Sequence, residues 1–181
     1  MSLLKYKVLK KQNIGRQCIV CGNENNLGLK SDFYELETGE LLCVCNTKEY
    51  HQSYPGRVHG GISAAILDET IGRAVSIGNE EVWGVTVSLE IKYKKPVPTD
   101  AKIYAIGRID SENRRLFEGS GEIILENGEI AATAHGKYMK MDINKIAEGD
   151  FFNEKEWFEN PDDVEEIEIP DVKIKKKNDK K

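Results

Sequence analysis

The sequence has no long apolar run and no basic stripe, and these two absences exclude whole classes of function. No stretch approaches the roughly 20 apolar residues that a membrane-spanning helix requires. The net charge is −5, and lysine and arginine do not interleave with aromatic residues, so neither nucleic acid nor a membrane is an expected partner. No apolar signal-peptide segment follows the first residues, and we therefore expect a cytoplasmic protein.

Cysteine is scarce, with residues only at Cys18, Cys21, Cys43 and Cys45. A cytoplasmic protein is not expected to hold disulfides. The Cys18-x-x-Cys21 pair is half of a zinc site, and Cys43-x-Cys45 is the one candidate for the second half. We favour buried thiols with no metal. A small zinc-linked interaction module built on the four cysteines is the alternative.

The composition favours one soluble domain with charged flanks. Hydrophobic residues make up 39% and charged residues 31% of the 181-residue chain, which is enough to bury a core. We expect an N-terminal arm over residues 1–16, a domain over 17–141, and a C-terminal extension over 142–181 that is charged and partly disordered. Trp157 and Phe158 are expected to dock back on the domain.

The hydrophobic periodicity predicts a hairpin, one long helix and then four more strands. The hairpin spans residues 29–46 with its turn at Thr38-Gly39, and the helix runs from 61 to 77 and is stopped by Gly78. The helix is apolar nearly all round, which indicates cover on several sides. The later strands are expected at 83–95, 102–109, 116–125 and 129–141, with an Asn127-Gly128 turn. One helix against a curved antiparallel sheet is an α+β fold.

A glycine turn and two carboxylates mark the start of this helix as the candidate site. His59-Gly60-Gly61 leads directly into the helix, and Asp68 and Glu69 lie within its apolar sequence. A buried helix excludes carboxylates unless they are paired or used. We expect Glu69 to form an ion pair and Asp68 to react. A structural Asp68, capped by the backbone or by Arg73, is the alternative.

These motifs resemble those of one enzyme family. The Asp stands nine residues after the His of the HGG turn, and a Thr-containing strand follows the helix and ends at Pro96. The sequence thus resembles the hotdog-fold acyl-CoA thioesterases of the phenylacetate-pathway (PaaI-like) type, over about residues 17–140. The motifs concerned are His59-Gly60-Gly61, Asp68-Glu69-x-x-Gly72, Gly84-Val85-Thr86-Val87, Tyr93-Lys94-Lys95-Pro96, and Cys18-x-x-Cys21-Gly22 with Leu27-Gly28-Leu29.

The resemblance implies a hotdog fold, in which a curved antiparallel sheet wraps a long central helix, and an acyl-CoA substrate hydrolysed to a carboxylic acid and CoA. No cofactor and no metal are implied. Asp68 would be the base that activates water, or the nucleophile itself. The Gly61 N–H would polarise the thioester carbonyl. The hydroxyl of Thr86 would position the water, at a place where the family commonly has serine.

The loop before the helix departs from the family pattern. An Asn often assists the carbonyl there, but this chain offers only Gln52 or Ser53, of which Ser53 matches by count. His59 is expected to hold the helix start, with direct catalysis as the alternative. The remaining substrate-binding candidates are Gly60, where a carbonyl can approach closely, Arg57, which can meet CoA phosphates, and Tyr54, which can line an acyl pocket.

The spacing of Gly61 and Asp68 points to a second subunit. Seven residues along one helix correspond to about 10 Å, so one thioester carbonyl cannot contact both residues. Either they serve different parts of the ligand, or Asp68 acts with Gly61 of a partner helix. A two-fold homodimer, alone or as a dimer of dimers, supplies that helix. The alternative function is a non-catalytic acyl-CoA-binding or sensing hotdog protein.

Overall fold

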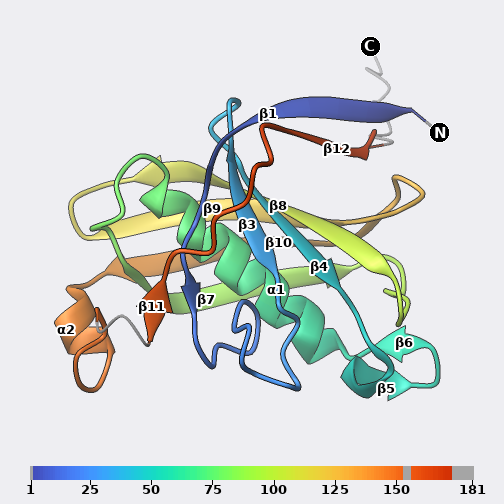
Figure 1. The fold of residues 1–181 in the computed structure, drawn as a ribbon, viewed down its shortest axis with the longest axis horizontal. Coiled ribbons are helices and arrows are strands. Elements are labelled where there is room, and N and C mark those ends of the chain that lie inside the picture. The colour runs from blue at the N-terminus through green and yellow to red at the C-terminus, as the bar shows by residue number, and fades with distance from the viewer. Residues whose placement is uncertain (1, 153–155, 173–181) are drawn as a thin grey trace, which may run out of the picture.

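One long helix lies across an eight-stranded antiparallel sheet (Figure 1). The computed structural model describes residues 2–152 and 156–172. The eight main strands follow the order β12-β1-β3-β4-β8-β9-β10-β7, and α1 spans Gly60–Arg73. This arrangement confirms the predicted α+β class. The strands are β1 (Leu3–Lys11), β3 (Asp32–Leu36), β4 (Leu41–Asn46), β7 (Gly84–Tyr93), β8 (Lys102–Glu112), β9 (Leu116–Leu125), β10 (Ile130–Lys140) and β12 (Glu166–Pro170).

Short elements surround the two ends of α1. Two small sheets, β2 with β11 and β5 with β6, lie near opposite ends of the helix (Figure 1). No helix in the described part of the chain is long and apolar enough to cross a membrane. The short elements are β2 (Ile14–Gly15), η1 (Glu49–His51), β5 (Gln52–Tyr54), β6 (Arg57–Val58), η2 (Ala74–Ser76), α2 (Ile143–Ile146) and β11 (Trp157–Phe158).

Both predicted hairpin turns are confirmed. Gly39, between β3 and β4, has φ +79° and donates its N–H to the Leu36 carbonyl. Gly128, between β9 and β10, also has φ +79° and donates to Leu125. Glycine adopts this left-handed conformation without steric cost, so the turn positions set the register of the paired strands.

The flanks contain strands that the sequence analysis did not predict. Residues 1–16 were expected to form an arm, yet β1 pairs with β3 on one side and with β12 on the other. Its lysines alternate with Tyr6 and Val8, which pack against a second apolar cluster that includes Ile169. This two-residue period is typical of a half-exposed strand. The lysine-rich segment 173–181 lies outside the described residues, and the division at 16 and 141 stays a prediction.

Helix α1 is covered on both faces, as its composition indicated. Ile66, Leu67 and Ile71 are fully buried among the strands and the loop that precedes β3. After Arg73 the helix tightens into the 3-10 turn η2, and Gly78 at φ +71° ends the segment near the predicted place. The reactive candidates on α1 therefore lie on a rigid element of the core.

The close approach of α1 to the sheet depends on a glycine in β8. A Cβ added at Gly107 would lie 2.6 Å from the carbonyl oxygen of Thr70, which is a backbone atom and cannot turn away. The helix backbone therefore rests directly on the β8 backbone at this point.

We expect Gly107→Ala to lower the free energy of unfolding by about 1–3 kcal/mol, because the methyl group overpacks this contact. The melting temperature of a chain of this size should fall by about 2–4 °C for each kcal/mol. Urea and thermal unfolding measure both quantities. Ser111→Ala, at an exposed position of the same strand, should change the stability by less than about 0.5 kcal/mol. Equal stabilities of the two variants would contradict the close contact.

Candidate active site

The first turn of α1 is held by two histidines. His59 is the N-cap residue, and its Nδ1 accepts the Gly61 N–H at 2.8 Å. The backbone N–H of His59 in turn donates to the carbonyl of the buried His51 at 2.8 Å. His51 Nδ1 accepts the Lys48 N–H, and its Nε2 lies 3.0 Å from the Leu27 carbonyl, so a proton on Nε2 satisfies both contacts. His51 is a packing residue, and His59 holds the helix start.

One oxygen of the Asp68 carboxylate accepts hydrogen bonds from neighbouring side chains, and the other accepts none from the described residues. Oδ1 accepts the hydroxyl of Thr86 at 2.9 Å, and the Tyr138 hydroxyl shares its one proton between Oδ1 at 3.2 Å and the Asp68 backbone carbonyl at 3.1 Å. No hydrogen-bond partner of Oδ2 occurs among the described residues. A carboxylate oriented in this way presents one basic oxygen in a fixed direction.

Tyr138 is a contact of Asp68 that the sequence analysis missed. Burial, reinforced by the negative charge of Asp68, raises the pKa of the Tyr138 hydroxyl, so this group stays protonated and donates. Tyr138 lies opposite Thr86 in the register of β10 and β7. The pairing of these two strands could have identified Tyr138 from the sequence, because the side chains of directly opposite residues point to the same face of a sheet.

The second acidic residue of the helix has a structural partner. Glu69 Oε1 lies 2.9 Å from Arg73 Nε, and the two side chains are 20% and 13% exposed. The expected ion pair of Glu69 is therefore confirmed. Arg73 does not pair with Asp68, so the alternative in which Arg73 neutralises Asp68 is wrong.

A cavity of about 760 Å³ lies beside Asp68, Thr86 and Tyr138. Part of its wall is aromatic, because Trp83 meets Trp157 edge to face with ring centroids 5.2 Å apart. Trp157 comes from the C-terminal extension, which confirms that this segment docks back on the domain. Such a cavity has the size of a small-molecule site.

The other predicted site residues lie near the beginning of α1 rather than beside Asp68. The β5–β6 hairpin carries three of them on its exposed surface, near the start of the helix (Figure 1). Tyr54 is 73% exposed, and the Gly60 carbonyl accepts the Tyr93 hydroxyl at 2.9 Å. The chain thus brings Asp68 and Thr86 together and separates them from a second group, which comprises Ser53, Tyr54, Arg57, His59, Gly60 and Gly61.

Comparisons with known proteins agree with this architecture. Residues 55–132 match the family model described as the thioesterase superfamily. The acyl-coenzyme A thioesterase THEM4 of Mus musculus is 32% identical over 125 residues, which are 67% of this chain and 53% of that protein. The crystal structure of a thioesterase superfamily protein superposes with a TM-score of 0.63 at 28% identity, covering 68% of this chain and 60% of that one.

A further solved structure shares the fold alone. It is a hypothetical thioesterase protein with coenzyme A from Streptococcus pneumoniae, with a TM-score of 0.52 and 21% identity over 57% of this chain and 80% of that chain. This chain spans about half the length of the curated relatives it matches. The similarities confirm the predicted hotdog fold.

Proposed function

We infer the function of this chain from the family to which it belongs, the hotdog-fold thioesterase superfamily. We propose that it hydrolyses the thioester of an acyl-CoA to CoA and a free carboxylic acid. The curated relatives are named as acyl-coenzyme A thioesterases, and one structural neighbour was solved with coenzyme A. The acyl part of the substrate would occupy the cavity beside Asp68, against Trp83 and Trp157.

The geometry of Asp68 is the observation that carries the proposal. Thr86 and Tyr138 hold Oδ1, which leaves Oδ2 to take a proton from a water molecule. The water oxygen attacks the carbonyl carbon, and the tetrahedral intermediate carries negative charge on its oxygen. Collapse breaks the C–S bond, and the sulfur leaves with the proton that Asp68 had received. A carboxylic acid and a thiol result, Asp68 returns to its initial state, and the acid then loses its proton to solvent.

The oxyanion needs a donor, and we propose that a partner subunit supplies it through Gly61. Gly61 and Asp68 lie on one helix at positions that a single carbonyl cannot span. The Gly61 N–H is bonded to the exposed ring of His59, which must turn aside when substrate binds. The neighbouring Gly60 N–H has no acceptor within residues 2–152 and 156–172, so it offers a second donor at the same helix end.

An unpaired sheet edge supports the dimer. In the described chain, the ten-residue strand β7 pairs with β10 and with no second strand. Long open edges promote association, and the exposed side chains of β7 include Val87 at 56% and Tyr93 at 57%. Pairing of β7 with its two-fold copy would extend the sheet across both subunits. It would also lay the two α1 helices side by side on the joined sheet.

Binding without hydrolysis is the second candidate function. The bond between Gly61 and His59 favours it, because the proposed oxyanion donor is already used within the chain. Such a protein would retain acyl-CoA in the same cavity and act as a carrier or sensor.

A panel of acyl-CoA esters decides between the two functions. The chain is incubated with short, medium, long and aryl esters, release of CoA is followed with a thiol reagent, and binding is measured by calorimetry. Hydrolysis of at least one ester supports the proposal. Binding without thiol release across the panel would replace it with the carrier function.

We expect Thr86→Val to reduce kcat for the best ester by about 10- to 100-fold. The variant removes a hydrogen bond to a charged group, which is worth about 1.5–3 kcal/mol. Thr86→Ser keeps the hydroxyl, so its kcat should stay within about threefold of the wild-type value. This change is much smaller than the one expected from loss of the hydrogen bond. Steady-state kinetics on both variants provide the measurement. A Val variant that turns over as fast as the Ser variant would show that Asp68 does not depend on the hydroxyl.

A further inference from the structure

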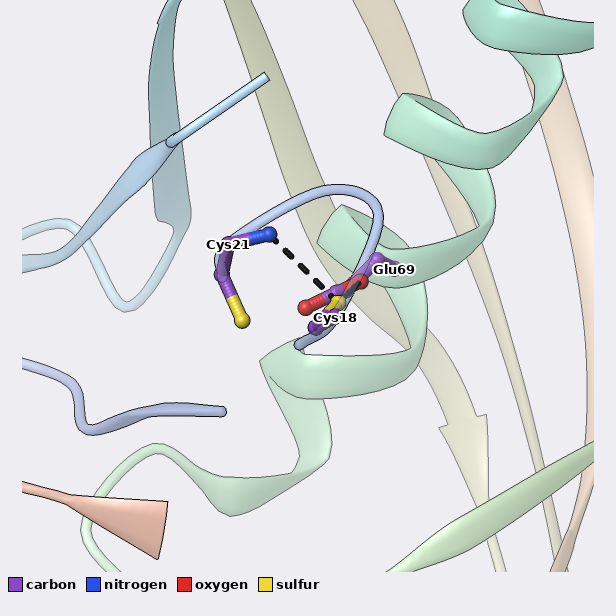
Figure 2. A group of neighbouring side chains, drawn as sticks. All are labelled: Cys18, Cys21 and Glu69. Carbon is purple, nitrogen blue, oxygen red and sulfur yellow. Dashed lines mark hydrogen bonds between the residues drawn. The ribbon is translucent and has the colours of Figure 1, made fainter. Parts of the chain in front are cut away.

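A group of three potential metal ligands lies on the second face of α1. The Cys18 and Cys21 sulfurs and a Glu69 carboxylate oxygen all lie within 4.8 Å of one another (Figure 2). Both cysteines come from the loop between β2 and β3, which folds over α1 at Glu69. The described residues contain no other group of three such side chains at this spacing. Cys43 and Cys45 are buried in β4 and do not join it, so the alternative of a zinc site built on all four cysteines is wrong.

The loop directs hydrogen-bond donors at the two sulfurs. Cys18 Sγ accepts the backbone N–H groups of Val20 at 3.3 Å and of Cys21 at 3.4 Å. Cys21 Sγ accepts the N–H of Gly15 at 3.3 Å and a guanidinium N–H of Arg73 at 3.0 Å. A neutral thiol is a weak acceptor, so four donors on two sulfurs suit thiolates better. Ordered donors around a ligand atom are typical of metal sites.

A single proton occupies the place that a cation would take. The Cys18 thiol donates to Glu69 Oε2 at 3.1 Å, so a hydrogen atom now bridges the sulfur and the carboxylate. A cavity of about 490 Å³ borders all three side chains and leaves room for a water molecule as the fourth ligand. Two thiolates and one carboxylate with a water form a tetrahedral donor set that suits Zn²⁺.

The charges of the three candidate ligands and Arg73 are balanced for such an ion. With both thiols protonated, the charge of Glu69 is cancelled by Arg73, its partner at 2.9 Å. Exchange of the two thiol protons for a divalent cation leaves this sum at zero. Arg73 is fixed in the same place by the Asn13 carbonyl and by the ring of Phe33, so it remains as a counter-charge to the thiolates.

We propose that Cys18, Cys21 and Glu69 bind one zinc ion, which ties the loop between β2 and β3 to helix α1. The site is structural and takes no part in the thioester chemistry. Because Glu69 adjoins Asp68, the ion fixes the part of the helix from which Asp68 projects. The proposal stands independently of the thioesterase function.

Metal titration of the untagged full-length chain tests the proposal. The protein is reduced with a phosphine, stripped with a chelator and titrated with Zn²⁺ against a chromophoric competitor. We expect one equivalent to bind per chain and the melting temperature to rise with it. Titration with Co²⁺ should produce the near-ultraviolet charge-transfer band of sulfur ligation and the intense visible bands of a four-coordinate ion.

Matched variants identify the ligands. Cys18→Ser, Cys21→Ser and Glu69→Gln should each weaken zinc binding by about tenfold or more. Cys45→Ala removes a buried thiol outside the group and should bind zinc as the wild type does. Absence of the cobalt charge-transfer band in the wild type, or a Cys18–Cys21 disulfide that forms in place of zinc binding, would overturn the proposal even if the variants fail to fold. Equal zinc affinity of Cys18→Ser and Cys45→Ala would also overturn it.

Discussion

Asp68→Asn is expected to lower kcat for acyl-CoA hydrolysis by about 10²- to 10⁴-fold, the usual contribution of a general base. The asparagine carbonyl can still accept the hydroxyls of Thr86 and Tyr138, so the local structure should persist. An amide has no basic oxygen and cannot take the proton of water. KM should change little, because the variant removes a group that acts in the transition state.

The matched control is Asp110→Asn. Asp110 is exposed on β8 and accepts a hydrogen bond from Ser120, so the same change of charge occurs outside the candidate site. Thiol release followed under steady-state conditions compares both variants with the wild type. If Asp68→Asn retains full turnover while folding normally, Asp68 is a structural carboxylate and the proposed chemistry is wrong.

Gly61→Pro is expected to reduce kcat by about 10²- to 10³-fold, the cost of losing one oxyanion donor. Proline has no N–H, so the variant also loses the bond from Gly61 to His59 Nδ1, but the first turn of a helix tolerates proline because no backbone carbonyl of the helix accepts the N–H groups there. Gly60 has no side chain, which limits the restriction that proline imposes on the preceding residue. Circular dichroism and a melting curve establish that α1 still forms.

Gly61→Ala distinguishes the loss of the N–H donor from steric crowding at the helix start. The added Cβ would lie 3.0 Å from His59 Nδ1, which belongs to an exposed ring that can rotate away. This variant keeps the N–H and should retain most of the activity. If the alanine and proline variants are equally slow, crowding at the helix start explains the loss, and Gly61 is not the oxyanion donor.

The central part of the fold could be predicted from the sequence, because its helix and strands are marked by patterns among residues close together in the chain. The 3.6-residue period and Gly78 located α1, and alternation located β7 to β10 within a few residues. The two outermost strands on one side of the sheet, β12 and β1, were missed, and for β1 the reason is physical. β1 buries few side chains, so its alternation of lysine with Tyr6 and Val8 carries little hydrophobic contrast.

Only part of the candidate site could be predicted from the sequence. The contacts that were missed join residues far apart in the sequence. Asp68 was found as a carboxylate within an apolar helix and Thr86 through the resemblance to a known family, and a hydrogen bond of 2.9 Å joins them. The contact with Tyr138 joins residues 70 positions apart, and the contact of Cys18 with Glu69 joins residues 51 apart. Such pairs depend on strand register and loop path, which local periodicity does not specify.

Complementation between two inactive variants tests the shared active site most directly. The Asp68→Asn and Gly61→Pro variants are mixed in equal amounts, and the proposed dimers are dissociated and allowed to reassemble. A mixed dimer contains one site with both an intact Asp68 and an intact Gly61, so random pairing should restore about one quarter of wild-type activity. Activity that stays at the level of the separate variants, although mixed dimers have formed, would contradict the pairing of Asp68 with Gly61 of the other subunit.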